Sequence, residues 1–323
     1  MSSNAKTEYS FPSGKFYLKF KTAGVIGVPK SGKTALGNLL ATHRNVEYYE
    51  EPWLLGVLPA MVKFEMIDGE VGKDMYVTYL HELMNDLILL RQANFRPNDG
   101  SSIWTKKTAA EIFSRLVSLR SRSDVKNFVK KNNPIFLMAM SESSLFNLPA
   151  IFDFLPDCKI IHMVRRGIDV AYQIKKKGGL SDEQLAKPPH ARVYRPAADK
   201  HPPFYMPCWV DPKDESKFME YSEYERALFY WCVLMENMMD SYKKLKGKSR
   251  RVLTIKFEDL IKNPRKMLKK ANLFLNLEPT SLTETALRKI DNYGKICEKA
   301  PELPEELLIR TKKIYKYFKY GWD

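Results

Sequence analysis

The eight residues from Gly27 to Thr34, Gly-Val-Pro-Lys-Ser-Gly-Lys-Thr, have the types and spacing needed to hold a phosphate group. They match the pattern G-x-x-x-x-G-K-[ST] of nucleotide-binding loops at every fixed position. Such a loop offers backbone N–H groups and the positive end of a helix dipole to an anion, and Lys30 and Lys33 add full charges. Two lysines flanking Ser31 and Gly32 make an ordinary surface turn the weaker interpretation. The sequence therefore predicts an anion site here.

A strand before this loop and a helix after it must position those groups. Residues 21–28 are apolar and β-branched towards their end, which indicates a short buried strand. Residues 34–42 repeat leucine at helical spacing, at Leu36, Leu39 and Leu40. The loop is therefore expected to join the end of a strand to the start of a helix, where N–H groups without partners face an anion.

Further apolar strands alternate with helical segments, which indicates one parallel sheet covered by helices. Strands are expected at 45–49, 134–140, 159–164 and 252–257, and helices at 74–92, 109–119, 145–154, 224–245 and 260–277, the last interrupted early by Pro264. The predicted fold class is α/β, with three layers, a five-stranded parallel sheet, helices on both faces and a phosphate-binding turn like that of P-loop proteins. A chain of 323 residues suits a single domain over residues 1–323.

Residues 178–221 break this alternation. Six prolines lie between Pro188 and Pro207, and the apolar periodicity is lost. A long aperiodic segment inside a compact domain is usually a lid or a binding loop. This proline-rich insertion is therefore predicted to form a loop or lid beside the site.

The charge of the chain narrows the choice of partners. The formal net charge is +15 at pH 7, and lysine-rich runs at 175–177, 243–251 and 312–313 are spread along the sequence. This spread favours general surface charge and long-range attraction of a polyanionic ligand. It is less typical of a basic face for nucleic acid or of a basic amphipathic membrane helix. We therefore expect no nucleic-acid partner and no membrane partner.

Cysteine, histidine and hydropathy patterns exclude further classes. The four cysteines are scattered without a C-x-x-C pair (Cys158, Cys208, Cys232 and Cys297), and the five histidines lack metal-ligand spacing. Residues 1–20 lack the apolar core of a signal peptide, and the longest nearly apolar stretch, 53–62, is too short to span a bilayer. The expectations are reduced thiols, no metal and a soluble, cytoplasmic protein.

The ends of the other strands bear on which phosphate chemistry the loop performs. A magnesium-dependent kinase or NTPase normally has an aspartate at the end of a strand near the loop. The third strand ends in Met140-Ser141, the fourth in Arg165-Arg166, and the fifth in Glu258-Asp259, which is typical of a polar helix start. Two arginines repel a cation and attract another phosphate. An ATP-dependent enzyme remains one alternative, and a non-catalytic nucleotide- or nucleic-acid-binding module remains another.

Several blocks of the chain resemble the sulfotransferases that use 3′-phosphoadenosine 5′-phosphosulfate. Pro29-Lys30-Ser31-Gly32-Lys33-Thr34-Ala35-Leu36 is similar to their 5′-phosphosulfate loop, P-K-S-G-T-T-x-L, and residues 159–171, K-I-I-H-M-V-R-R-G-I-D-V-A, are similar to their 3′-phosphate segment. Phe257-Glu258-Asp259-Leu260 with Asn263-Pro264 resembles their Y-E-D-L-x-x-[DN]-P block, and Tyr320-Gly321-Trp322 resembles their G-Y ending. These blocks follow the family order from residue 24 to the C-terminus.

The resemblance implies a donor, a product and a set of binding residues. The donor is 3′-phosphoadenosine 5′-phosphosulfate, and the product is adenosine 3′,5′-bisphosphate. The phosphosulfate would be held by Lys30, Ser31, Gly32, Lys33, Thr34 and Ala35, and the 3′-phosphate by Arg165 and Gln173. Two departures stand out, because Lys33 replaces the usual threonine and Gln173 replaces a serine. An amide donates the same hydrogen bond with a longer reach, and a guanidinium binds phosphate bidentately.

The resemblance also implies a mechanism of in-line sulfuryl transfer to a hydroxyl, amine or guanidine of a small-molecule acceptor. Lys30 would stabilise the departing phosphate. One family branch uses a histidine base after the third strand, but Met140-Ser141-Glu142-Ser143 stands there. Branches that act on saccharides use a glutamate in F-E-P or F-E-E settings, which Tyr49-Glu50-Glu51-Pro52 resembles. Glu51 is therefore the predicted base, with Glu50 and then His43 as weaker candidates.

The acceptor side is expected to be lined by residues 53–73 and by the proline-rich insertion. Both contain aromatic side chains, and the insertion also carries several acids, which suits an amphiphilic or cationic small molecule. Soluble bacterial sulfotransferases of natural-product pathways, including those for alkaloid toxins, are the type that the chain resembles.

Overall fold

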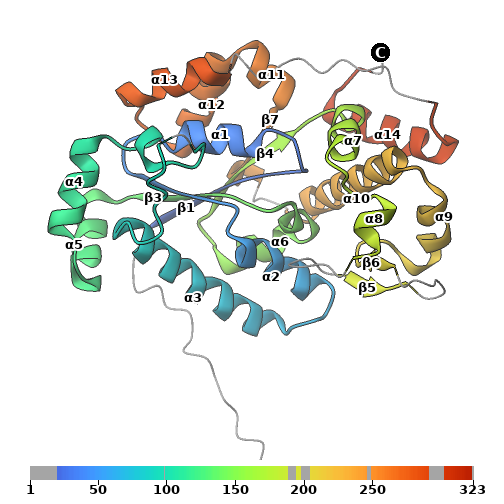
Figure 1. The fold of residues 1–323 in the computed structure, drawn as a ribbon, viewed down its shortest axis with the longest axis horizontal. Coiled ribbons are helices and arrows are strands. Elements are labelled where there is room, and N and C mark those ends of the chain that lie inside the picture. Colours follow the sequence, from blue (N-terminus) through green and yellow to red (C-terminus); the bar gives the residue numbers. More distant parts are fainter. Residues whose placement is uncertain are drawn as a thin grey trace, which may run out of the picture.

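Five parallel strands form the centre of the structure, a computed structural model that describes residues 20–97, 99–187, 194–197, 204–245, 249–290 and 302–321. The strands are β1 (Lys21–Gly27), β2 (Val46–Glu50), β3 (Ile135–Ala139), β4 (Lys159–Val164) and β7 (Val252–Lys256), in the order β2-β3-β1-β4-β7. All four pairings are parallel. The predicted α/β fold and its five strands are confirmed, because each strand lies within a few residues of its predicted position (Figure 1).

Alternate residues of the strands enter two separate apolar cores. Ile26, Met138 and Ile160 pack into one core, whereas Val25 and Leu137 pack into the other. This alternation follows from the period of two in a strand, and it requires helices on both faces of the sheet.

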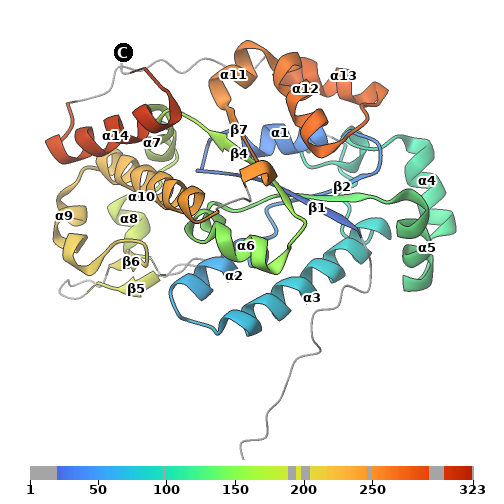
Figure 2. The same ribbon diagram turned by 180° about the vertical axis from the view of Figure 1, so that it is seen from behind.

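Helices cover each face of the sheet, as Figures 1 and 2 show from opposite sides. One face carries α1 (Lys33–Leu40), α11 (Phe257–Lys262), α12 (Pro264–Leu275) and α13 (Ser281–Ile290). The other carries α2 (Trp53–Lys63), α3 (Gly69–Ile88), α6 (Leu148–Phe154), α7 (Gly167–Lys176), α10 (Glu223–Lys244) and α14 (Glu305–Phe318). A 3₁₀ turn, η2 (Glu142–Phe146), precedes α6.

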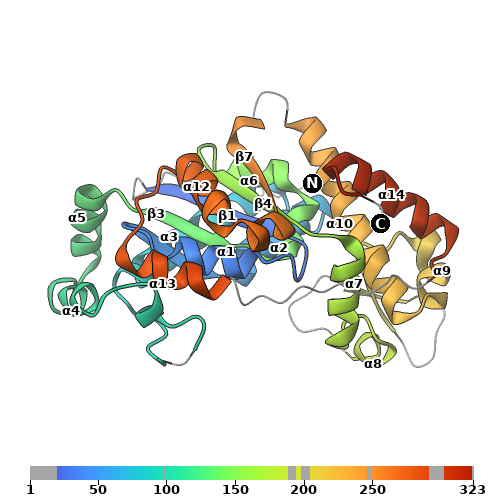
Figure 3. The same ribbon diagram turned by 90° about the horizontal axis from the view of Figure 1, so that it is seen from above.

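Two further helices lie beyond the β2 edge of the sheet. They are α4 (Ala109–Ser118) and α5 (Arg122–Asn132), preceded by the 3₁₀ turn η1 (Ile103–Thr105). Seen from above, α4 and α5 stand at the opposite end of the molecule from α14 (Figure 3). Ser121 and Asp124 form a capping box at the start of α5, which fixes the tight turn between the two helices.

Several helices differ from the sequence-based expectation. The helix predicted at 74–92 begins earlier, at Gly69, because the Asp68 carboxylate caps the N–H groups of Glu70 and Val71. The helix predicted at 145–154 is split into η2 and α6. The break at Pro264 separates α11 from α12, as predicted.

The proline-rich insertion contains short elements in its described parts. They are α8 (Asp182–Leu185), an antiparallel hairpin of β5 (Tyr194–Pro196) and β6 (Tyr205–Pro207), the 3₁₀ turn η3 (Pro212–Asp214), and α9 (Glu215–Glu220). The expectation of an irregular segment was therefore wrong for these stretches, although residues 188–193 and 198–203 lie outside the described ones.

Three other expectations from the sequence concern the cysteines, membrane-spanning helices and metal sites. Cys158, Cys208 and Cys232 are not joined in disulfides, and Cys297 lies outside the described residues. No helix in the described ranges has both the length and the apolar character needed to cross a membrane. The same ranges contain no cluster of three or more His, Cys, Asp or Glu side chains that could hold a metal ion.

Candidate active site

The carboxyl ends of all five parallel strands meet at one edge of the sheet. The loop of residues 28–32 follows β1, Glu51 follows β2, Glu142 comes shortly after β3, and Arg165 follows β4. β1 is the central strand of the sheet, and it pairs with β3 on one side and with β4 on the other. Ligands of open α/β sheets bind at such a switch point. The topology therefore gathers the predicted residues Glu51 and Arg165, together with Glu142, around the loop.

The loop is shaped by two residues with positive φ. Lys30 has φ of 62° and Gly32 has φ of 88°, while the Ser31 N–H donates to the Val28 carbonyl over 3.2 Å. A Cβ atom at Gly32 would lie 2.5 Å from the Phe257 ring, so only glycine fits there. The glycine brings the loop against the start of α11 and turns the chain into α1.

The first turn of α1 leaves backbone donors for a ligand. Leu36 donates its N–H to the Gly32 carbonyl over 3.0 Å. Within the described residues, no backbone carbonyl accepts from the N–H groups of Lys33, Thr34 or Ala35. The Ser31 Oγ is buried and has no hydrogen-bond partner in the described structure, whereas the Lys30 side chain is exposed. These groups fit the anion site predicted from sequence.

Lys33 is buried and lies between two carboxylates. Its Nζ is 3.2 Å from Glu51 Oε1 and 3.3 Å from Glu142 Oε2. Burial alone lowers the pKa of Lys33, but Glu142 and Glu51 outweigh burial, so the net pKa lies above its usual value. The lysine that creates the G-x-x-x-x-G-K-[ST] match thus joins the loop to the predicted base.

Glu51 occupies a strained but well-anchored position. Its φ is 50°, its N–H donates to the Ala139 carbonyl over 2.8 Å, and Pro52 follows it at the start of α2. The carboxylate is half-exposed, so an acceptor in solution could reach it. Glu142 is less exposed and was not singled out by the sequence. Its position after a strand that ends at the same edge was the one signal for it.

Glu50 belongs to a neighbouring group of charges. Burial raises its pKa, an effect that Lys106 opposes, and the Thr34 hydroxyl hydrogen-bonds to its carboxylate. Burial also lowers the pKa of Lys106 to about 8. The Lys106 Nζ donates to the Ser101 carbonyl over 2.8 Å and lies 4.9 Å from the centre of the Tyr48 ring. Glu50 therefore contacts the first turn of α1 but does not pair with Lys33.

Arg165 reaches from the end of β4 to the loop. One of its terminal nitrogens donates to the Lys30 carbonyl over 2.6 Å, and its guanidinium carbon lies 4.2 Å from the centre of the Phe257 ring. Its Nε is buried without a partner in the described structure. Burial lowers its pKa from the usual value. Gln173 is half-buried in the second turn of α7 and has no described contact with the loop.

Arg166 and Glu258, the first acid after β7, have structural partners. The Arg166 side chain pairs with Asp169 over 2.9 Å, and the Arg166 backbone N–H donates to Glu258 Oε1 over 3.1 Å. The other oxygen of Glu258 accepts from the Tyr320 hydroxyl over 2.9 Å. Both oxygens of Glu258 are thus occupied by protein donors.

His43 does not belong to the site. It lies beyond the C-terminal end of α1, opposite the loop, and it is buried with Nδ1 3.1 Å from the Leu40 carbonyl oxygen. Burial lowers its pKa. The suggestion that His43 could serve as a base is therefore withdrawn.

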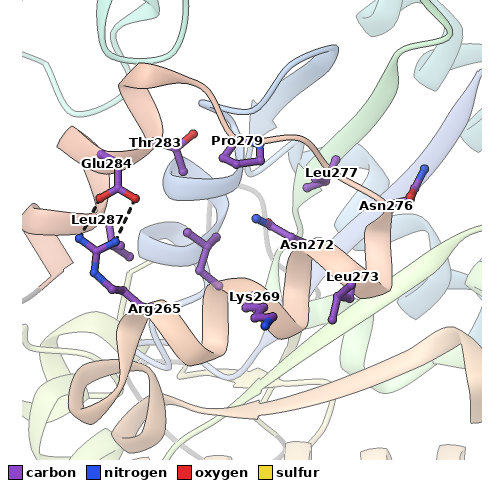
Figure 4. Close-up of a pocket in the computed structure, with 11 residues that line it drawn as sticks. Arg265, Lys269, Asn272, Leu273, Asn276, Leu277, Pro279, Thr283, Glu284 and Leu287 are labelled. Carbon is purple, nitrogen blue, oxygen red and sulfur yellow. Dashed lines mark hydrogen bonds and ion pairs between the residues drawn. The ribbon is translucent and has the colours of Figure 1, made fainter.

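A separate groove lies between α12 and α13 (Figure 4). Its volume is about 330 Å³, and an ion pair of Arg265 and Glu284 spans one end of it. None of the predicted site residues lines this groove. It is therefore not the anion site.

The fold and the loop together define an α/β protein with a P-loop-like turn after the first strand of its parallel sheet. Residues 24–186, half of the chain, match the sequence profile described as "Sulfotransferase family". The chain belongs to the sulfotransferase family. No curated protein matches its sequence.

Solved structures with similar folds are distant in sequence. The sulfotransferase domain of the Synechococcus PCC 7002 olefin synthase is 16% identical, with 96% of this chain and 98% of that chain covered and a TM-score of 0.47. The sulfotransferase domain from the curacin biosynthetic pathway is 12% identical, with 95% and 100% covered and a TM-score of 0.47. Sulfotransferase STF9 from Mycobacterium avium is 9% identical, with 94% and 78% covered and a TM-score of 0.49.

Proposed function

We propose that the protein transfers a sulfuryl group from 3′-phosphoadenosine 5′-phosphosulfate to a hydroxyl, amine or guanidine of a small molecule. The observation that carries this proposal is the hydrogen bond from Arg165 to the Lys30 carbonyl. It sets a guanidinium directly beside an anion-binding loop, which suits a donor with a phosphate at its 3′ position and a phosphosulfate at its 5′ position. Family membership supports the same reading.

The proposed reaction is an in-line displacement at sulfur. The acceptor oxygen or nitrogen forms the new bond to sulfur, while the bond from sulfur to the phosphate oxygen breaks and adenosine 3′,5′-bisphosphate leaves. Lys30, the Ser31 hydroxyl and the N–H groups at the start of α1 stabilise the charge that develops on the leaving phosphate. Arg165 and Gln173 hold the 3′-phosphate. Gln173 keeps this role as a prediction.

Glu51 is the proposed general base. The acceptor proton moves to its carboxylate as the acceptor attacks sulfur. Lys33 holds this carboxylate in place from one side, and Glu142 anchors Lys33 from the other. An incoming phosphosulfate competes for the Lys33 ammonium, so donor binding would loosen the ion pair and make Glu51 available to the acceptor.

The acceptor is proposed to be a cationic or amphiphilic molecule, such as an alkaloid or another natural product. The carboxylates of Glu50, Glu51 and Glu142, which lie at or shortly after the ends of β2 and β3 at the edge of the sheet that carries the loop, would attract a cation. Trp53 at the start of α2 is 49% exposed and would offer an apolar surface. We further propose one domain over residues 1–323, an acceptor-side lid in the proline-rich insertion, and action in the cytoplasm without nucleic-acid or membrane partners.

Two features weigh against a magnesium-dependent kinase. Lys33 is held by two carboxylates and would have to leave both to bind β- and γ-phosphates. Glu258, the first acid after β7, is also engaged, because it accepts from Arg166 and Tyr320.

Calorimetric titration distinguishes these functions. The protein is titrated with adenosine 3′,5′-bisphosphate, and separately with ATP and Mg²⁺. We expect tight binding of the bisphosphate without metal. Adenosine 5′-phosphate, titrated as a matched control, should bind at least about tenfold more weakly, because it lacks the 3′-phosphate that Arg165 would bind. Magnesium-dependent ATP binding without bisphosphate binding would overturn the proposal.

A further inference from the structure

Helix α4 has a buried arginine on its inner side and three large apolar side chains on its outer side. Arg115 is 5% exposed and binds both oxygens of the buried Glu47 in β2, over 2.9 and 2.6 Å. Glu111, on the same side of the helix, pairs with Arg115 and with Lys107. A surface helix normally has the opposite arrangement.

The outer side of α4 carries no charged residue. Phe113 is 63% exposed, Leu116 51% and Val117 65%. The other outward residues are small and are also exposed: Ala109, Ala110, Ser114 and Ser118. We call these seven residues the α4 face. In a chain with 28% charged residues, three turns of helix without an outward charge form an unusual surface.

The helix cannot turn to hide this face without losing its anchors. Ile112 packs with Leu90 and Ile103 in a small core under α4. The Arg115 guanidinium carbon lies 4.7 Å from the centre of the Phe128 ring in α5. Any rotation that buried Phe113 would expose Ile112 and leave Glu47 buried without its arginine, which is strongly unfavourable. The apolar surface is thus fixed by the interior of the protein.

We propose that the α4 face is the contact surface for a second copy of this chain, packed helix against helix about a two-fold axis. Large and small side chains alternate on it, so Phe113 and Val117 of one copy can fit against Ala110 and Ser114 of the other. The α4 face contains no charged residue, and Glu111 and Arg115 beside it are already paired with each other within each copy. Figures 1 and 3 place α4 at one end of the molecule, where a second copy can approach.

The size of the face sets the strength of this contact. Three turns of helix bury roughly 400–500 Å² on each copy, so roughly 800–1,000 Å² in total, near the lower limit for a specific interface. The dimer is therefore expected to exchange with monomer at micromolar concentration. Since each copy carries a net charge of +15, added salt should strengthen the dimer by screening repulsion. Added salt would instead weaken the binding of an acidic protein or a nucleic acid to the same end of the molecule.

Sedimentation velocity over a range of concentrations tests this proposal. The wild-type protein should show a monomer–dimer equilibrium that shifts towards dimer when NaCl is raised from about 50 to about 500 mM. Val117→Asp should raise the dissociation constant at least about tenfold, because it sets a carboxylate without a partner against the small side chains of the other copy. Ile309→Asp is the matched control, since Ile309 is 59% exposed on α14 at the other end of the molecule, and it should dimerise as the wild type does.

Site-specific crosslinking locates the axis. Ser114→Cys should form an intermolecular disulfide under mild oxidation, whereas Asn127→Cys, exposed on α5 outside the α4 face, should not exceed the wild-type background. A protein that stays monomeric at every concentration, or a dimer that survives Val117→Asp, would overturn the proposal. Neither measurement depends on the proposed reaction or on any nucleotide.

Discussion

Two clusters of charged side chains involve β2 or the residue after it, one centred on Glu47 in the strand and one at the loop, where Lys33 meets Glu51. They differ in how completely their polar atoms are paired. In the first cluster, Glu47 receives two hydrogen bonds from Arg115 and one from Lys107. Burial alone raises the pKa of Glu47, but Arg115 and Lys107 outweigh it and hold the pKa at about 2. The Arg115 Nε is the one atom of this cluster without a partner in the described structure.

The second cluster, at the loop, is incompletely paired. Lys33 is shared by Glu51 and Glu142, Glu51 is half-exposed, and the buried Ser31 Oγ and Arg165 Nε have no partner among the described residues. Buried polar atoms without partners are costly unless a ligand completes their hydrogen bonds. The difference teaches that the first cluster stabilises the fold, whereas the second is arranged for a ligand.

The sharpest way to break this comparison is Glu51→Gln, which keeps the shape of the side chain and removes its basicity. We expect turnover to fall by about 10²- to 10⁴-fold, because the acceptor loses its general base. The melting temperature and the calorimetric affinity for adenosine 3′,5′-bisphosphate should change little. Glu50→Gln is the matched control, and full activity of Glu51→Gln beside an inactive Glu50→Gln would assign the base to Glu50.

Substitutions in the first cluster, around Glu47, should change the free energy of unfolding. Arg115→Leu should lower the free energy of unfolding by about 3–5 kcal/mol, because it leaves Glu47 buried without its main partner. Arg122→Leu removes an exposed arginine that pairs with Glu82 and should cost less than about 1 kcal/mol. Urea unfolding measures both. Equal losses for the two variants would contradict the distinction between the clusters.

Lys30→Ala tests whether the loop acts in turnover as well as in binding. Removing a charge aimed at the leaving phosphate should lower turnover by about 10²- to 10³-fold, with a smaller loss of bisphosphate affinity. Lys21→Ala, an exposed lysine at the other end of β1, serves as the control and should leave both quantities unchanged. If affinity falls as much as turnover, Lys30 only binds the donor.

Lys33→Thr introduces the residue that related loops carry, and it tests the role of the ion pair between Lys33 and Glu51. We expect about a tenfold loss of turnover, because Glu51 is no longer held in place. Steady-state turnover at saturating donor measures this loss, and Glu51→Gln in the Lys33→Thr background should add less than it does in the wild type. A double variant whose loss is the product of the two single losses would mean that Lys33 does not act through Glu51.

The smallest effect concerns Lys106, which stands between the two clusters. Its pKa is lowered from 10.5 to about 8 by burial, so the folded protein releases this proton earlier than the unfolded chain does. The unfolded state therefore binds more protons between pH 8 and 10.5, and the free energy of unfolding should rise with pH there. From pH 8 to 9 we expect a gain of about 1 kcal/mol relative to Lys106→Gln, measured by urea unfolding at each pH. A parallel pH dependence in the two proteins would rule this out.

The parts of the fold that the sequence predicted depend on local patterns. Apolar runs marked the five strands, and the glycine-bearing turn marked the loop between β1 and α1. The strand order could not be predicted in the same way, because β1 pairs with β3 and β4, which lie far along the chain. Helix α2 was missed because it contains Pro59 and is buried on most sides, so it shows little periodicity.

The site was predicted in part for the same reason. Lys30, Glu51 and Arg165 carry recognisable surroundings in the sequence, and the structure gathers the loop, Glu51 and Arg165 at one edge of the sheet. The partnership of Lys33 with Glu142 joins residues with no local signal and exists only through tertiary contact. Periodicity likewise predicts that residues 109–119 form a helix, but it cannot tell that Arg115 turns inward and Phe113 outward.

The backbone of Glu51 sets stability against activity at one position. A φ of 50° is unfavourable for most residues with a side chain, and it costs of order 1 kcal/mol or more. Glycine adopts this conformation freely, and asparagine more easily than glutamate. Selection for folding alone would therefore favour glycine or asparagine at residue 51. A laboratory search for thermostable variants without an activity screen is expected to recover these residues at position 51 and to lose enzymatic activity.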